Sequence, residues 1–284
     1  MILTPDSAPL SRDIADYPEG IIIPIDKPYR WTSADVIRKV KFAAIRHFGK
    51  KNLKVGHAGT LDPLATGVLL VCIGKATKLA EELQRHDKEY VAGVTFGATT
   101  PSYDLEKEID RFFPYEHITS EAVADALPAF IGEQNQIAPL FSAKSVDGVR
   151  AYELARRLHK EGKTLDEAAQ ELIRVSRITI SELELIEFSA GCCERSCSSA
   201  STTPSSAASS RINVTDNSAL GLPRAVIRMA CSKGTYVRAF ARDLGEALGS
   251  GAHLDSLQRS RSGIFRIENA LSIEQAIELL QPAQ

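Results

Sequence analysis

Apolar positions along the chain follow two periods, and each period predicts one kind of element. Continuous apolar runs or strict alternation, typical of strands, occur at 20–25, 68–73, 88–96, 172–188 and 224–231. Apolar residues three or four apart, typical of helices, occur from Ser33, a candidate N-cap, to His47 and at 77–84, 120–130, 150–160, 235–248 and 273–280. A loop rich in Gly, Lys and Pro is expected at 49–66.

The order of these elements shows no regular βαβ rhythm and no internal repeat. We therefore predict an α+β protein with a mixed, mainly antiparallel sheet flanked by helices. No apolar run approaches the ~18 residues of a membrane helix, and the N-terminus lacks a basic segment followed by an apolar one. The protein is thus expected in the cytoplasm, without membrane contact.

The segment 189–211 differs in composition from the rest of the chain. Its 23 residues include nine Ser and two Thr but no Leu, Ile, Val or aromatic residue, so it cannot bury enough surface to become ordered. We predict a disordered insertion there, within one catalytic domain at 20–284 that follows a flexible segment at 1–19. The five cysteines are odd in number and form no C-x-x-C pair, which argues against disulfides and structural zinc. Three of them lie in the insertion, where a labile metal or redox role is a minor alternative.

The charge of the chain is unevenly distributed. The net charge of −2 argues against a nucleic-acid partner, since such proteins usually carry a basic excess. Between Lys27 and Lys54, however, nine basic residues stand against the single acid Asp35. This stretch is either a phosphate-facing patch or a solvated helix face with a basic loop, and charge alone does not choose between them.

The stretch 56–67, GHAGTLDPLATG, is the part of the chain richest in residues that impose an unusual backbone conformation. Three Gly and one Pro predict a tight loop that presents Asp62 and His57 just before a buried strand, where catalytic groups tend to lie. Asp62 suits a nucleophile or a general base, with His57 as a second polar group over the same cleft. The alternative is an Asp-Pro turn whose carboxylate only bonds backbone. A phosphate-binding P-loop is excluded, because the glycine spacing is wrong and Lys75 is followed by Ala.

Five motif blocks, in order from about 20 to 270, give the sequence a family resemblance. They are DKP at 26–28 with WTS at 31–33, GHAGTLDPLATGVL at 56–69, KEY at 88–90, SAK at 142–144 with GVRAYE at 148–153, and SKGTYVR at 232–238. In these blocks the chain resembles the bacterial TruB family of tRNA pseudouridine synthases. The resemblance implies the pseudouridine synthase fold, with a central RNA-binding cleft, and the isomerisation of uridine 55 in the T-loop of tRNA without metal or cofactor.

The resemblance also implies roles for single residues. Asp62 matches the catalytic aspartate, Tyr90 the aromatic residue that stacks on the target base, and Arg238 the arginine paired with the aspartate. His57 matches a residue that holds the flipped-out nucleotide, and Leu257 an apolar residue near the base. Lys27 and Tyr236 are expected to shape the site. A carboxylate suits attack on C1′, addition to the base or removal of a ribose proton, and the sequence does not choose among these routes.

Two features depart from the family, and two other functions compete with it. Many members continue into a C-terminal PUA-type RNA-binding domain, for which the chain is expected to leave no room. The Ser-rich insertion is also unusual for the family.

The competing functions are an N-ribosyl hydrolase and a tRNA-folding protein without turnover. Glycoside hydrolases usually need a second positioned carboxylate, and the block around Asp62 contains none. The presence of Asp62, Tyr90 and Arg238 together argues against a protein that has lost catalysis. The expected partner is the T-arm of tRNA, bound by a monomer that needs no other protein.

Overall fold

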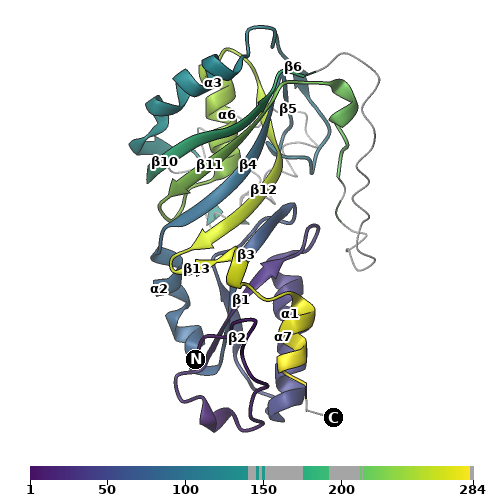
Figure 1. Ribbon diagram of the computed structural model, residues 1–284, viewed down its shortest axis with the longest axis vertical. Helices are drawn as coiled ribbons and strands as arrows, with labels where there is room; N and C mark the ends of the chain where they lie inside the picture. Colours follow the sequence, from purple (N-terminus) through teal and green to yellow (C-terminus); the bar gives the residue numbers. More distant parts are fainter. Residues whose placement is uncertain (140–144, 147–148, 151–174, 192–211, 213, 282–284) are drawn as a thin grey trace. The chain divides into compact units, whose positions relative to one another are not determined.

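The computed structural model describes residues 1–139, 145–146, 149–150, 175–191, 212 and 214–281 (Figure 1). The chain divides into two compact units. Unit 1 comprises Met1–Tyr90, Pro204–Ile212 and Gln258–Gln284, and unit 2 comprises Val91–Thr203 and Asn213–Leu257. The boundaries between the units after Tyr90 and after Leu257 fall within strands β4 (Lys88–Phe96) and β12 (Ala252–Ser262). Each of these two strands therefore has residues in both units.

The main sheet follows the order β1-β3-β12-β4-β11-β10-β7, with β2 paired to β3 and β13 paired to β12. The further bounds are β1 (Ile21–Lys27), β2 (Val55–Ala58), β3 (Ala65–Ile73), β7 (Gly132–Gln136), β10 (Ser176–Ser189), β11 (Arg224–Cys231) and β13 (Phe265–Arg266). Within the units, β3 pairs antiparallel with β1 and β2, and β10 with β7 and β11. The predicted α+β class with a mainly antiparallel sheet is confirmed.

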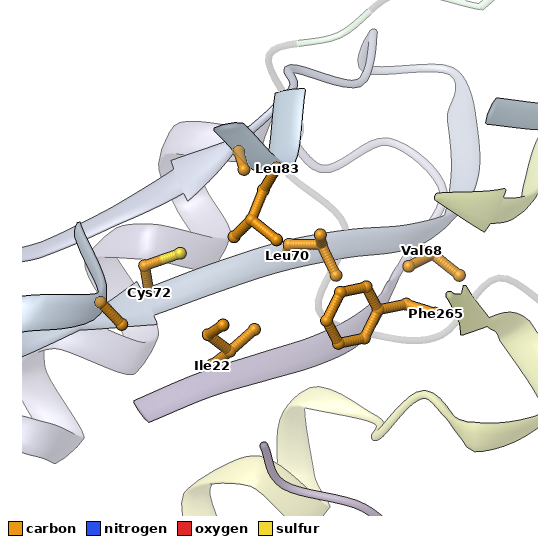
Figure 2. Close-up of a cluster of buried hydrophobic side chains, with 8 residues drawn as sticks. Ile22, Val68, Leu70, Cys72, Leu83 and Phe265 are labelled. Atoms are coloured by element: carbon orange, nitrogen blue, oxygen red, sulfur yellow. The ribbon is translucent and has the colours of Figure 1, made fainter. Parts of the chain in front are cut away.

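The core of unit 1 is built on one face of β3. Val68, Leu70 and Cys72 alternate along the strand, so their side chains point the same way (Figure 2). Ile22 and Phe265 pack against them from β1 and β13. Because β3 follows the loop that carries Asp62, this buried strand gives the loop a rigid base.

Helix α1 (Ser33–Phe48) lies in unit 1. Ser33 is its first residue, whereas an N-cap at Ser33 would place the first helical residue at 34. Thr32 is the N-cap: its hydroxyl accepts from the backbone N–H of Asp35, whose carboxylate accepts from the Thr32 N–H in return. The helix ends at Phe48, and Gly49 after it has a φ of 61°, the left-handed conformation common at that position. The N-cap prediction was wrong because Ser33 is bound elsewhere. Alongside α1 lies α7 (Ile273–Leu279) (Figure 1).

In unit 2, α3 (Ser120–Ala126) and α6 (Val237–Ala247) lie beside β10 and β11 (Figure 1). The 3₁₀ turn η3 (Leu127–Phe130) extends α3 and brings the ring of Phe130 to 5.4 Å from that of Phe240 on α6, in an edge-on contact. The shorter elements are η1 (Ile14–Asp16), η2 (Gly74–Leu79), α2 (Ala80–Arg85), β5 (Ala98–Thr99), β6 (Arg111–Phe112), β8 (Ser145–Val146), β9 (Val149–Arg150), η4 (Ser218–Leu220) and η5 (Ile267–Asn269).

Several boundaries differ from the prediction. The expected loop at 49–66 contains β2 and the start of β3, and the expected helix at 77–84 is divided between η2 and α2. Strands β7 and β12 were not predicted, because neither carries a continuous or strictly alternating apolar run. Of the helix expected at 150–160, Arg150 ends β9, and residues 151–160 lie outside the described residues. The SAK block and most of the Ser-rich insertion also lie outside them.

The first residues of the chain pack onto unit 1. Leu3 is fully buried and its N–H donates to the carbonyl of Ile22 on β1, while the N–H of Leu10 donates to Leu279 on α7. The flexibility expected for this segment and its boundary with the domain stay predictions. No helix among the described residues is long and apolar enough to cross a membrane.

Candidate functional site

The loop between β2 and β3 presents Asp62 at a partly exposed position. Leu61 and Leu64 on either side are buried, at 4% and 9% exposure, so they anchor the loop on the core of unit 1. The carbonyl of Asp62 accepts from the N–H of Ala65 at 3.1 Å, which closes a tight turn. The apolar neighbours and the Asp-Pro turn together fix the backbone that carries Asp62.

Ser33 holds the residue before Asp62. The Ser33 hydroxyl accepts from the N–H of Leu61 at 3.0 Å and donates to the carbonyl of Leu61 at 3.1 Å. Ser33 is 4% exposed, so these bonds are shielded from water. The first turn of α1 is thereby connected directly to the Asp62 loop, which explains why Ser33 is not the N-cap.

The DKP block holds the other side of the loop. The ammonium of Lys27 is fully buried and donates to the carbonyls of Pro28 at 2.9 Å, Trp31 at 2.6 Å and Pro63 at 3.2 Å. Asp26 accepts from the N–H of Gly67 at 3.0 Å. Two adjacent residues of β1 therefore hold this stretch: Lys27 binds Pro63, directly after Asp62, and Asp26 binds Gly67, at the start of β3.

The charge of Lys27 also bears on Asp62. Burial lowers the pKa of Lys27 to about 7, and the negative charge of Asp62 is the largest opposing influence. Three carbonyl acceptors match the three N–H donors of an ammonium, whereas a neutral amine has only two. This geometry fits the charged form, which attracts the Asp62 carboxylate.

His57 lies on β2, in the same unit as Asp62. Its pKa is lowered, first by burial and then by the positive charge of Arg259, so the neutral imidazole is favoured at neutral pH. The Nδ1 atom is buried and meets no hydrogen-bond partner among the residues that the structure describes.

Tyr90 lies on β4, is the last residue of the first segment of unit 1, and is 8% exposed. Its neighbour Lys88 donates to the carbonyls of Gln84 and His86 at the end of α2. Cations favour the carboxyl end of a helix, where carbonyl groups lack helical partners. The KEY block thus anchors α2 through its lysine, and the same anchor fixes the strand that carries Tyr90.

Arg238 lies in the first turn of α6, in unit 2, and is 5% exposed. Its Nη1 donates to the carbonyl of Ser102 at 3.1 Å, and its Nε lies 3.7 Å from Oδ2 of Asp104, whose side chain is also buried. The Asp104 carboxylate accepts in turn from the Ser102 hydroxyl at 2.6 Å. Asp104 was missed at the sequence level, because nothing in its local pattern pairs it with a residue more than a hundred positions away.

Tyr236 precedes α6, and Gln136 on β7 holds its backbone. The Gln136 side chain accepts from the Tyr236 N–H at 2.8 Å and donates to the Tyr236 carbonyl at 3.2 Å. Leu257 lies on β12 and is partly buried. Unit 1 therefore contains Lys27, His57, Asp62 and Tyr90, whereas Tyr236, Arg238 and Leu257 belong to unit 2.

The implied pairing of Arg238 with Asp62 joins residues of different units and stays a prediction. So do the catalytic and binding roles of all seven residues. No group of His, Cys, Asp and Glu side chains suited to a metal ion is found among the described residues. Sequence reasoning also missed Arg259, which is fully buried on β12.

Comparison with known proteins identifies close relatives. The family model described as "TruB family pseudouridylate synthase (N terminal domain)" matches residues 46–237. The tRNA pseudouridine synthase B of Phocaeicola vulgatus is 48% identical over 265 residues, which cover 93% of this chain and 95% of that protein. The protein of the same name from Deinococcus radiodurans is 38% identical, over 90% of this chain and 78% of that protein.

Solved structures share the fold at lower identity. A chain in the crystal structure of a Cbf5-Nop10-Gar1 complex aligns with a TM-score of 0.59 and 23% identity, over 97% of this chain and 58% of that one. A chain of an H/ACA RNP bound to a substrate RNA aligns with a TM-score of 0.57 and 21% identity, over 97% of this chain and 61% of that one. This chain spans about three fifths of the length of either structure, and both support the fold alone. From the family model and the close relatives together, the chain belongs to the TruB family of pseudouridine synthases.

Proposed function

We propose that the protein is a tRNA pseudouridine synthase that isomerises uridine 55 in the T-loop. The observation that carries the proposal is the placement of Asp62, whose loop is held by Ser33 before it and Lys27 after it in a chain of the TruB family. A carboxylate fixed in this way is prepared for a reaction at an electron-poor carbon, because little motion is needed to bring it into position.

The reaction exchanges one bond for another. The bond between C1′ and N1 breaks, the uracil turns, and a bond forms between C1′ and C5. C5 loses its proton and N1 gains one, so the RNA keeps its composition. In the proposal Asp62 acts on the ribose or the base, Tyr90 stacks on the uracil, and Arg238 pairs with Asp62. The ion pair with Asp104 supports Arg238 by limiting its rotation.

The remaining residues are assigned to substrate binding. We assign the neutral imidazole of His57, which is partly exposed, to a contact with the nucleotide, and Leu257 to an apolar contact with the base. Lys27 shapes the site through the backbone of the loop and Tyr236 through the start of α6. Flipping a nucleotide out of a loop costs a few kcal/mol, so a site of this kind needs several contacts to hold it.

Incubation of unmodified tRNA with the protein, followed by chemical mapping of pseudouridine, tests the function. We expect one new pseudouridine at position 55 and no change in the mass of the RNA. Release of uracil with loss of that mass would establish an N-ribosyl hydrolase instead. Tight binding of tRNA with neither product would establish a binding protein without turnover.

A basic face on α1 and the loop after it supports tRNA as the partner. Seven of its basic residues are exposed: Arg38, Lys39, Lys41, Arg46, Lys50, Lys51 and Lys54. Phe42 lies among them with 70% of its surface exposed, and Arg38 and Arg46 flank it four residues away on either side. Exposed cations can neutralise phosphates and an exposed ring can stack on a base. The phosphate-facing interpretation is therefore the one we propose.

Conversion of Lys50, Lys51 and Lys54 to Gln should weaken tRNA binding and flatten its salt dependence. Each lost phosphate contact lowers the slope of log K against log salt by about one unit, so we expect a change of up to roughly three. Saturated turnover should stay near the wild-type value, because the three lysines lie outside the Asp62 loop. Binding titrations at several salt concentrations measure both quantities.

The matched control changes three other exposed basic residues of unit 1, Lys75, Lys78 and Arg85, whose neighbours Glu81 and Glu82 are acidic. This variant should keep the wild-type slope. Equal slopes in all three proteins would contradict the assignment of the basic face to RNA.

The proposed T-arm contact has its own test. A hairpin of only the T-stem and T-loop should be nearly as good a substrate as whole tRNA, because the target uridine and the phosphates beside it are all present. A kcat/KM more than about a hundredfold lower than that of whole tRNA would correspond to ~2.7 kcal/mol of missing contact and would require binding elsewhere on the tRNA.

A further inference from the structure

Arg259 is one of the largest fully buried side chains among the described residues, at 1% exposure. Its Nε donates to the carbonyl of Val68 at 2.7 Å, and its Nη2 donates to the carbonyl of Gly59 at 3.0 Å. Gly59 precedes the Asp62 loop and Val68 follows it on β3 (Figure 2 labels Val68). One guanidinium group therefore holds the two ends of the loop together.

Gly59 and Gly67, which flank the Asp62 loop, fit this arrangement. Gly67 has a φ of +98°, and a Cβ atom there would lie 2.3 Å from the carbonyl oxygen of Arg259. Gly59 has a φ of +81°, and a Cβ atom there would lie 3.5 Å from Nη1 of Arg259. The backbone and the side chain of Arg259 thus both contact the loop closely, and Gly67 permits the closer of the two approaches.

The chemistry of the side chain suits this task. A guanidinium has a planar set of donors that can bind two acceptors at once, whereas an ammonium on a flexible stem lacks that fixed geometry. The acceptors at Val68 and Gly59 are neutral carbonyls, so burial of the charge is compensated by directed hydrogen bonds. The same positive charge contributes to the lowered pKa values of His57 and Lys27.

We propose that Arg259 is a positioning residue for Asp62, which fixes the place of the carboxylate by tying Gly59 to Val68 across the loop. The inference rests on the proposed function and goes beyond it by adding a residue that does not touch the substrate. Ser33 and Lys27 bind the interior of the loop, and Arg259 closes it. Displacement of a reacting group by about 1 Å can cost about a hundredfold in rate, so this closure matters for turnover.

The test compares Arg259→Lys and Arg259→Gln with the wild type in single-turnover assays on unmodified tRNA. We expect both variants to lower the rate by about ten- to a hundredfold and to keep the tRNA Kd within about threefold. Lys keeps the charge but not the two-acceptor geometry, so it should not restore the rate. The matched control is Arg266→Gln, which removes an exposed arginine from β13 and should keep the wild-type rate.

A second control separates positioning from stability. Leu83→Ala removes a core side chain of unit 1 outside the loop and should lower the Tm without lowering the rate, when assayed well below that Tm. NMR titration of His57 adds a local readout: its pKa should rise in Arg259→Gln, which loses the neighbouring charge, and should stay near the wild-type value in Arg259→Lys.

Four results would overturn the positioning role: a wild-type rate in Arg259→Lys, a tRNA Kd that rises as much as the rate falls, an equal loss of rate in Leu83→Ala, or failure of both Arg259 variants to fold. The last result would show that Arg259 holds unit 1 together as a whole. Absence of pseudouridine with the wild-type protein would instead refute the proposed function. The two failures are therefore distinguishable.

Discussion

Asp62→Asn is expected to bind tRNA within a few-fold of the wild-type affinity and to keep less than about 1% of its turnover. The two side chains have almost the same shape, and the substitution leaves intact the bonds to the backbone of Gly59, Leu61 and Pro63 that hold the loop. The loop should therefore stay in place while the carboxylate is lost. Single-turnover conversion of unmodified tRNA measures the rate, and filter binding measures the affinity.

The control for this change is Asp87→Asn, an exposed aspartate of the same unit, which should behave as the wild type. Retention of more than about 1% of the rate by Asp62→Asn, a loss under ~2.7 kcal/mol, would make Asp62 a structural residue. The Asp-Pro turn would then be the correct interpretation of this loop.

Gly67→Ala is expected to destabilise the protein by roughly 3–5 kcal/mol and to lower the Tm by roughly 10 °C. A methyl group at this position would lie 2.3, 2.8 and 2.9 Å from the O, N and C atoms of Arg259. These are backbone atoms of a paired strand and cannot rotate away, so β12 would have to shift. The positive φ of Gly67 adds strain for any residue with a Cβ. Thermal unfolding followed by circular dichroism measures the change.

Gly49→Ala is the matched control. Gly49 also has a positive φ, of +61°, but no atom lies within 4 Å of the Cβ position, since it follows the end of α1. Its substitution should cost only about 1 kcal/mol, from backbone conformation alone. Equal decreases in Tm for the two variants would mean that conformation, and not the contact with Arg259, makes Gly67 necessary.

Local pattern was enough to predict much of the fold. Strands β1, β4 and β11 consist of apolar or alternating residues, and the apolar stripe of α6 repeats at helical spacing, so each reveals itself within about ten positions. The tight loop around Asp62 could be predicted for the same reason, because Gly and Pro restrict the backbone locally. The motif blocks then supplied the family, which the comparisons confirmed.

The tertiary structure alone decided how that loop is held. Arg259 is 200 positions from Gly59 and 191 from Val68. It lies on a strand rich in polar residues, so the hydrophobic pattern of that strand does not indicate that Arg259 is buried. Ser33 is of a residue type that often caps helices, yet its hydroxyl binds the backbone of Leu61, 28 positions away. Hydrophobic patterning reports which face of an element avoids water, and it carries no information about which distant carbonyl a buried donor will meet. The sequence by itself therefore determined many of the elements and the family, and it predicted Asp62 as the catalytic residue. The folded chain decided which side chains hold the loop around Asp62.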